Sequence, residues 1–211
     1  MKKSLFFDLD GTLWNALSPL TESWNKAMED NNLPYRFDIK AMTSYMGLTP
    51  EETVPLAFKD VPFEIGMKYF SLCLDAEIKY LAIHPGTPYP FEREVLKDLS
   101  SLYPLYIVSN SGKGYIENYL TALKMTEYFK GHLCVGDLGL VKYQNILYIK
   151  KQENFTDIIY IGDTYKDLVE SRKASVSFVH ASYGFGVINE KVNSISSLKE
   201  LPSLVKKIFN D

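Results

Sequence analysis

The 211-residue chain contains only two cysteines, Cys73 and Cys134, and three histidines. Each cysteine lies within an apolar run, and neither has a partner at a metal-binding spacing, so we expect buried free thiols. The histidines likewise have no partners at ligand spacing, and we expect structural roles for them. This scarcity argues against a fold held together by disulfides and against a zinc centre.

The sequence also lacks a long hydrophobic run and an excess of charge of one sign. No run approaches the ~18 apolar residues of a membrane span. The short apolar run after the N-terminal lysines ends in aspartates, unlike a signal peptide. A net charge of −3 gives no reason to expect a nucleic-acid partner. We therefore expect a cytoplasmic protein that binds neither nucleic acid nor membrane.

What the chain does contain is a regular alternation of strand and helix patterns. Hydrophobic residues make up 46%, as in ordinary globular proteins. Five apolar runs predict strands at 4–7, 105–109, 133–135, 158–162 and 176–181, mostly unbroken as in parallel strands covered on both faces. Helical spacing occupies 89–102, 114–125, 143–152, 164–174 and 196–209. The alternation predicts an α/β fold with a Rossmann-like, doubly wound parallel sheet.

One stretch, residues 15–84, breaks this alternation because it has helical patterns and no convincing strand. Within it, Thr49, Pro50 and Glu52 have the spacing of a helix start with a capping box. We predict an inserted α-helical cap domain at 15–84 and a core domain formed by 1–14 and 85–211, with the sequence HPGTPYP as the hinge. No apolar stripe is left over once both cores are assigned, so we expect a monomer or weak homodimer.

Four polar clusters follow predicted strands, where the carboxyl ends of parallel strands meet and ligands bind. The first is in the sequence LFFDLDGTLW, in which Gly11 allows a sharp turn with Thr12 behind it. The clusters are Asp8 with Asp10, Ser109 with Asn110, Lys142, and Asp163 with Asp167. Their common edge predicts a single site.

The chemistry that these side chains favour is phosphoryl transfer. Mg²⁺ prefers carboxylate oxygens, so Asp8 and Asp163 are candidate ligands together with a backbone carbonyl and waters. A cation would also offset the repulsion among clustered carboxylates. Asp8 is the candidate nucleophile that forms an aspartyl-phosphate. Asp10 is the candidate acid that protonates the leaving alcohol and the base that then activates water.

Phosphate oxygens require hydrogen-bond donors and positive charge. Ser109 and the backbone amides beside it are candidate donors, and Asn110 and Thr12 join them as phosphate-binding candidates. Lys113 lies near a predicted helix N-terminus and is a further candidate, although a solvated lysine is an equally good interpretation. Lys142 is expected to neutralise charge on the phosphoryl group and on Asp8.

Each cluster alone has an ordinary structural interpretation. An Asp-X-Asp pair is usually a turn or a helix start, and GDTYKD is typical of a helix N-terminus capped by an acid. A lone lysine or a Ser-Asn step indicates nothing by itself. Their joint occurrence, in this order on alternating strands, favours a shared catalytic site.

The motifs DLDGT at 8–12, VSN at 108–110, Lys142 and GDTYKD at 162–167 resemble the four ordered motifs of the haloacid dehalogenase (HAD) superfamily. The helical insert resembles the cap of its phosphoglycolate phosphatase and β-phosphoglucomutase branch. The resemblance implies a Mg²⁺ ion held by Asp8, the Asp10 carbonyl and Asp163 with support from Asp167. It also implies the nucleophile, acid/base and charge-stabilising roles given above for Asp8, Asp10 and Lys142.

The function that we expect is Mg²⁺-dependent hydrolysis of a small phosphorylated metabolite, phosphoglycolate-like or a sugar phosphate. The strongest alternative is a phosphomutase of the β-phosphoglucomutase kind, because it uses the same motifs. A receiver-like domain is less favoured because such domains have about 120 residues and no helical insert after the first strand. A non-catalytic binding protein is less favoured because both Asp8 and Asp10 are present. We also expect Trp14 to line the substrate entrance, because it closely follows the Asp8 loop.

Overall fold

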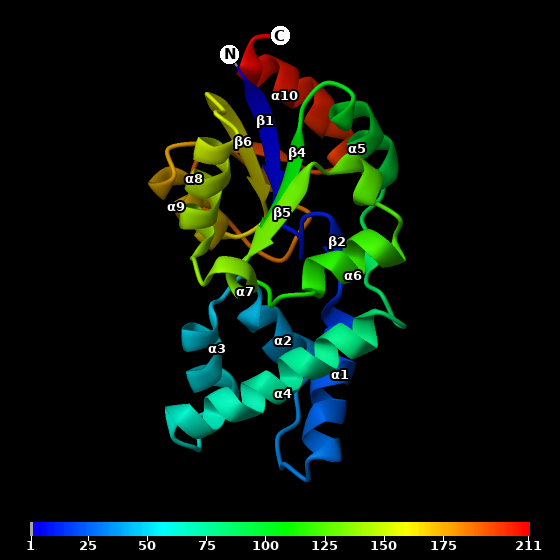
Figure 1. Ribbon diagram of the computed structural model, residues 1–211, viewed down its shortest axis with the longest axis vertical. Coiled ribbons are helices and arrows are strands. Elements are labelled where there is room, and N and C mark those ends of the chain that lie inside the picture. Colours follow the sequence, from blue (N-terminus) through cyan, green and yellow to red (C-terminus); the bar gives the residue numbers. More distant parts are fainter. Residues whose placement is uncertain (1) are drawn as a thin grey trace.

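The computed structural model describes residues 2–211, so that Met1 of the predicted core lies outside the described residues. Its centre is a six-stranded sheet in the order β5-β4-β1-β6-β7-β8, with every neighbouring pair parallel (Figure 1). The strands are β1 (Lys3–Phe7), β4 (Leu105–Ser109), β5 (Gly131–Cys134), β6 (Asp157–Gly162), β7 (Ser177–Ala181) and β8 (Asn193–Ile195). The predicted parallel α/β sheet is confirmed.

Strand β1 lies in the middle of the sheet, and its side chains alternate between two cores. Leu5 and Phe7 belong to one hydrophobic core, and Phe6 belongs to the core on the opposite face. Helices α5 (Glu92–Ser100), α6 (Tyr115–Ala122) and α10 (Leu201–Phe209) contribute buried residues to the first core. Helices α8 (Lys142–Gln152) and α9 (Tyr165–Lys173) contribute to the second. Both faces are therefore covered, which explains the unbroken apolar runs in the strands.

Four helices between β1 and α5 form the insert, which lies beyond the carboxyl ends of the strands in Figure 1. They are α1 (Leu17–Asp30), α2 (Ile39–Tyr45), α3 (Pro50–Ala57) and α4 (Phe63–Leu81). Trp24 of α1 is at their centre, where its ring packs edge-on against Phe37 and Phe70 and stacks with Tyr45. These aromatic rings belong to the same hydrophobic core as Leu5 and Phe7, so the core of the insert is continuous with the first core of the sheet.

Two short strands join the helical insert to the sheet. β2 (Trp14–Asn15) and β3 (Thr87–Pro88) pair antiparallel, so the chain enters and leaves the insert side by side. The predicted hinge sequence contains β3. The division of the chain into two domains at residues 14/15 and 84/85 stays a prediction.

Three details differ from the sequence-based expectations. β8 has no apolar run, since two of its three residues are exposed, and it was therefore not predicted. The C-terminal segment starts with a 3-10 turn (Leu198–Glu200) before α10 begins. Short helices also form at Val135–Leu138 (α7) and Thr126–Tyr128, the latter a 3-10 turn.

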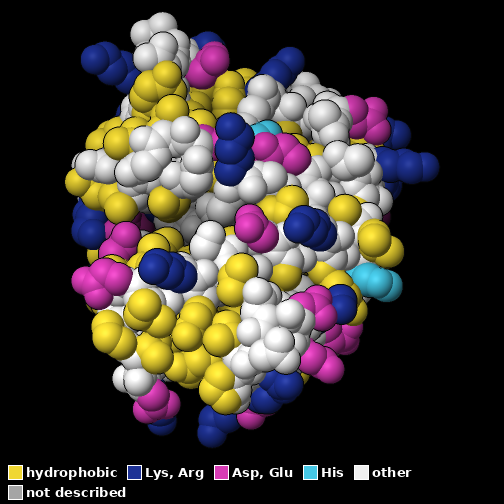
Figure 2. Space-filling view, turned by 60° about the horizontal axis from the view of Figure 1, so that its bottom comes forward, with side chains coloured by type: hydrophobic (Ala, Val, Ile, Leu, Met, Phe, Trp, Pro, Cys, Tyr) yellow, Lys and Arg dark blue, Asp and Glu magenta, His cyan; other side chains and the backbone are white. Residues whose placement is uncertain are grey.

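The surface of the helical end shows lysine and arginine side chains interspersed with acidic ones, without a patch of one sign (Figure 2). Across residues 2–211, no helix combines the length and the apolar character of a membrane span.

Candidate active site

The first acidic loop begins where β1 ends. The backbone N–H of Asp8 donates to the carbonyl oxygen of Ile161 (2.8 Å), which extends the β1–β6 ladder by one residue. Gly11 then has φ +80°, a left-handed conformation that favours glycine. This turn leaves Asp8 buried at the edge of the sheet and brings Asp10 to one wall of the cavity described below.

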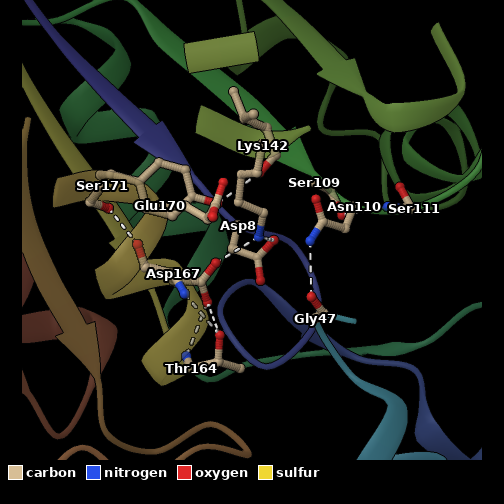
Figure 3. A network of polar contacts seen from close by, with 12 residues as sticks. Asp8, Gly47, Ser109, Asn110, Ser111, Lys142, Thr164, Asp167, Glu170 and Ser171 are labelled. Atoms are coloured by element: carbon tan, nitrogen blue, oxygen red, sulfur yellow. Dashed lines mark hydrogen bonds and ion pairs between the residues drawn. The ribbon is translucent and has the colours of Figure 1, made fainter. Parts of the chain in front are cut away.

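Lys142, the first residue of α8, links two of the carboxylates (Figure 3). Its Nζ donates to Asp8 Oδ1 (2.9 Å) and to Asp167 Oδ1 (2.6 Å), and its side chain is only 2% exposed. These carboxylates raise the pKa of Lys142 well above its ordinary value, against the effect of burial. The backbone N–H of Tyr143 donates to Glu170 Oε2 (3.0 Å) and fixes the start of α8 on α9.

Asp167 is held by the start of its own helix, α9. Its Oδ2 accepts hydrogen bonds from the backbone N–H (3.0 Å) and the hydroxyl group (2.7 Å) of Thr164. Both oxygens of Asp167 therefore have protein donors, because Oδ1 already accepts from Lys142. This arrangement suits Asp167 to orienting Lys142 and supporting a neighbouring ligand set.

Asp163, by contrast, keeps one oxygen free. Its side chain is fully buried, its Oδ2 accepts from the backbone N–H of Phe185 (2.7 Å), and its Oδ1 has no hydrogen-bond partner among the described residues. His180 Nε2 donates to the carbonyl oxygen of Asp163 (3.1 Å) and holds its backbone. A Cβ on Gly11 would lie 2.2 Å from Asp163 Oδ2, so only glycine leaves room for this carboxylate.

The buried carboxylates fit a divalent cation. One oxygen each from Asp8, Asp163 and Asp167 lies within 4.8 Å of the others. Three carboxylates face one ammonium group, that of Lys142, and an orphaned buried oxygen such as Asp163 Oδ1 is costly without a partner. A hard cation would supply both the missing charge and the missing partner. Burial, with Asp167 adding to it against the opposing effect of Lys142, raises the pKa of Asp8 to about 7.

Asp10 has a different environment from Asp8. Its Oδ1 accepts hydrogen bonds from Trp14 Nε1 (3.0 Å) and from the Tyr115 hydroxyl (2.8 Å). Burial raises the pKa of Asp10 to about 6, while these two hydrogen bonds act in the opposite direction. The carboxylate of Asp10 is outside the three-aspartate cluster, so its side chain is free for proton transfer near neutral pH.

The phosphate-binding candidates are placed differently from one another. Ser109, at the end of β4, accepts from the backbone N–H of Ser111 (3.2 Å), and Asn110 Nδ2 donates to the carbonyl oxygen of Gly47 in the helical insert (2.9 Å). Both line the cavity, and Asn110 Oδ1 has no hydrogen-bond partner within the described part of the chain. Thr12 is buried away from the cavity, its hydroxyl group likewise without a partner in residues 2–211, and Lys113 is exposed. Phosphate binding by these four residues stays a prediction.

A cavity of about 190 Å³ separates the strand ends from the helical insert. The sheet side contributes Asp8, Asp10 and Ser109, and the insert contributes Trp24, Phe70 and Glu77. The catalytic candidates thus open into a partly enclosed space that is bounded by both parts of the chain.

Three functional contacts were not predicted from the sequence. Trp14 does not line an entrance as expected, because it is fully buried with its indole N–H on Asp10. Tyr115 reaches Asp10 from α6, which no local pattern indicates. Glu77 lies on the buried face of α4 with Phe70 and Cys73, and a charged residue in an apolar stripe was a signal available in the sequence.

Comparison with known proteins agrees with the motifs. A family model described as haloacid dehalogenase-like hydrolase matches residues 5–181. A phosphoglycolate phosphatase of Chromobacterium violaceum is 26% identical over an alignment of 223 positions. The alignment covers 94% of this chain and 96% of the relative.

Solved structures share the fold. A predicted phosphoglycolate phosphatase from Haemophilus somnus superposes with a TM-score of 0.82 at 23% identity. The superposition covers 97% of this chain and 98% of the other. A β-phosphoglucomutase from Clostridium difficile superposes with a TM-score of 0.77 at 16% identity, covering 100% and 98%. These similarities extend over the sheet and the inserted helices alike.

Proposed function

The chain belongs to the haloacid dehalogenase-like hydrolase family and is a phosphatase, and we propose that it hydrolyses a small phosphomonoester with Mg²⁺ through an aspartyl-phosphate on Asp8. Asp8, Asp163 and the Asp10 carbonyl would hold the ion, with Asp167 in support. A bound Mg²⁺ would neutralise the carboxylates and the phosphate and lower the pKa of Asp8. Phosphoglycolate and sugar phosphates are the first compounds to test, given the names of the relatives.

In the first transfer, a carboxylate oxygen of Asp8 attacks phosphorus and the bond from phosphorus to the leaving oxygen breaks. Asp10 gives its proton to that oxygen, which leaves as an alcohol. Lys142, fixed between Asp8 and Asp167, holds positive charge beside the reacting group throughout. Ser109 and the amides of its loop supply hydrogen-bond donors to the phosphoryl oxygens.

In the second transfer, Asp10 takes a proton from a water molecule whose oxygen attacks phosphorus. The bond between phosphorus and Asp8 breaks, which releases inorganic phosphate and regenerates the carboxylate. The inserted helices form one wall of the cavity and would limit the access of bulk water during the first transfer.

The observation that carries this proposal is the pair of contacts made by Lys142. One buried ammonium group joins Asp8, at the end of β1, to Asp167, at the start of α9, although 134 and 25 residues separate it from them. A buried ion network of this kind adds little to the stability of the fold, because the cost of desolvating its charges offsets their attraction. The ion network lies beside the Asp163 oxygen that has no partner among the described residues and beside the cavity, and this position favours a catalytic role for it.

The test is phosphate release from p-nitrophenyl phosphate and a panel of phosphomonoesters, with Mg²⁺ and with EDTA. We expect Mg²⁺-dependent hydrolysis that falls by roughly a thousandfold or more in Asp8→Asn, because that variant lacks the nucleophile. Asp75→Asn, an exposed change of equal charge on α4, is the control and should keep full activity.

Undiminished hydrolysis in a folded Asp8→Asn variant would contradict the aspartyl-phosphate. Activity that survives EDTA would contradict the metal requirement. Transfer of the phosphoryl group to an added sugar phosphate, in place of water, would identify a mutase instead.

A further inference from the structure

The charged side chains that line the active-site cavity are all acidic. Among the described residues around it, the carboxylic acids are Asp8, Asp10 and Glu77, and none is a lysine, an arginine or a histidine. Lys142 lies behind Asp8 and is already paired with two carboxylates. The nearby surface offers no basic patch either, since charges of both signs are interspersed over that face (Figure 2).

Glu77 is the polar group that the helical insert places in this cavity. The side chain comes from the buried face of α4 and is 6% exposed. Trp24 Nε1 donates to Glu77 Oε1, and the other carboxyl oxygen has no hydrogen-bond partner among residues 2–211. Burial raises the pKa of Glu77 to about 8, and the charge of Asp10 also raises it. Glu77 therefore keeps unused hydrogen-bonding capacity beside the acid/base candidate.

The remaining wall on the insert side is mostly apolar, formed by Leu20, Met42, Met46, Leu48, Phe70 and Leu74. The cavity volume of about 190 Å³ is close to the ~150 Å³ that holds a benzene molecule in an engineered protein cavity. This volume must hold the phosphate as well, so the cavity suits a small substrate with an apolar body and few polar atoms.

Building on the proposed function, we propose that the substrate is a phosphomonoester of an uncharged alcohol that carries a further hydroxyl group, that this hydroxyl group binds Glu77, and that phosphoglycolate is a poor substrate. The carboxylate of phosphoglycolate would enter a cavity in which Asp10 and Glu77 already lie and no cationic side chain is present. Such a group would lose its hydration with no cationic side chain in the cavity to compensate its charge. A hydroxyl group can both donate to Glu77 and accept from it, so it fits either protonation state.

The test compares three small substrates that differ mainly at one end: phosphoglycolate, 2-hydroxyethyl phosphate and ethyl phosphate. With Mg²⁺, we expect kcat/KM for 2-hydroxyethyl phosphate to exceed that for phosphoglycolate by roughly tenfold or more, since only the latter carries a second anion. Ethyl phosphate should also be poorer by roughly tenfold, because it leaves Glu77 unpaired. A kcat/KM for phosphoglycolate equal to or above that for 2-hydroxyethyl phosphate would overturn the proposal.

Glu77→Gln removes the negative charge of Glu77 but keeps its hydrogen bonds. The amide oxygen can still accept from Trp24, and the amide group can still bind a hydroxyl group. At about pH 9, above the pKa of Glu77 of about 8, Glu77 is ionised, and we expect this variant to reduce the discrimination against phosphoglycolate several-fold while the preference for 2-hydroxyethyl over ethyl phosphate remains. Asp75→Asn, on the exposed face of the same helix, should leave both ratios unchanged. Unchanged discrimination in a folded Glu77→Gln variant would overturn the role of Glu77.

Binding separates this inference from the proposed function. Calorimetric titration of Asp8→Asn with Mg²⁺ and each of the three compounds measures preference without turnover. If no compound is hydrolysed by the unaltered protein, the proposed function fails. Tighter binding of 2-hydroxyethyl phosphate would then still support the substrate class, and equal or tighter binding of phosphoglycolate would overturn it.

Discussion

At the scale of single residues, two aspartates that lie two positions apart have different surroundings in the site. Asp8 is joined to Lys142 and faces Asp163 and Asp167, whereas Asp10 is bound by two neutral donors, Trp14 and Tyr115. Neutral donors leave Asp10 able to exchange a proton near neutral pH, whereas Lys142 lowers the pKa of Asp8 against burial and a bound Mg²⁺ would lower it further. The proposed separation of roles therefore follows from the groups that surround each aspartate.

The Tyr115 hydroxyl lowers the pKa of Asp10 from the value that burial alone would produce. Asp10 must carry a proton in the first transfer, so kcat/KM should fall as pH rises through this pKa of about 6. In Tyr115→Phe we expect this alkaline limb to move to higher pH by roughly one unit. Tyr119→Phe is the control, because its hydroxyl group is also buried on α6 but donates to Glu92. A pH–rate profile unmoved in Tyr115→Phe would refute the assignment.

Gly11 is required for two reasons, a φ of +80° and the contact with the Asp163 carboxylate. Gly11→Ala should cost about 1–2 kcal/mol for the left-handed backbone and should also displace Asp163. We expect the rise in melting temperature caused by Mg²⁺ to be lost in this variant. Gly139→Ala has the same type of backbone strain, with φ +66° and nothing within 4 Å of the added Cβ, and should keep that rise. An equal response to Mg²⁺ in both variants would contradict the metal site.

At the scale of the elements, Glu52 connects the inserted helices to the core. Its Oε2 accepts from the backbone N–H of Thr49 (2.7 Å) at the start of α3, as the sequence predicted, and also pairs with Lys166 of α9. One side chain thus caps the N-terminus of α3 in the insert and also holds α3 against α9 of the core.

Two substitutions separate these roles of Glu52. Glu52→Gln keeps an acceptor for Thr49 but loses the ion pair, so we expect a loss of less than about 1 kcal/mol in the free energy of unfolding. Glu52→Ala loses the helix contact as well, for roughly 1 kcal/mol more. Denaturant unfolding at low and high salt measures both, and salt should reduce only the ion-pair part. Equal losses for the two variants would show that Glu52 does not cap α3.

At the scale of the whole molecule, buried carboxyl groups make stability depend on pH. Glu92 is 2% exposed, and burial raises its pKa from an ordinary value of 4.5 to about 7, against a hydrogen bond from Tyr119. The folded state then binds the proton more tightly than the unfolded state. The contribution of Glu92 is therefore complete below pH 4.5 and is lost as pH rises through about 7.

We expect Glu92→Gln to remove this part of the pH dependence, since the amide does not titrate and its oxygen can still accept from Tyr119. The difference in unfolding free energy between the variant and the unaltered protein should change by roughly 3 kcal/mol between pH 4 and pH 8, in favour of the variant at high pH. Urea unfolding across this range measures it. Glu94→Gln, exposed on the same helix, should show no such trend, and a flat difference for Glu92→Gln would contradict the burial argument.

The sequence by itself determined the secondary structure, the parallel sheet and the family. Apolar runs, helical spacing and turn residues are local signals, and the four polar motifs lie where strands end. β8 escaped prediction because its pairing with β7, rather than an apolar run, makes it a strand. The order of the strands then brought Asp8, Lys142, Asp163 and Asp167 to one edge.

Only the tertiary structure decided what surrounds those motifs. Tyr115 reaches Asp10 across 105 positions, and Trp24 binds Glu77 across 53, so no local pattern could indicate either pair. The charge of the cavity is equally non-local, because it depends on which faces of the inserted helices meet the strand ends. Catalytic groups can be recognised from short motifs, whereas their pKa values and the substrate they accept follow from burial and from distant neighbours.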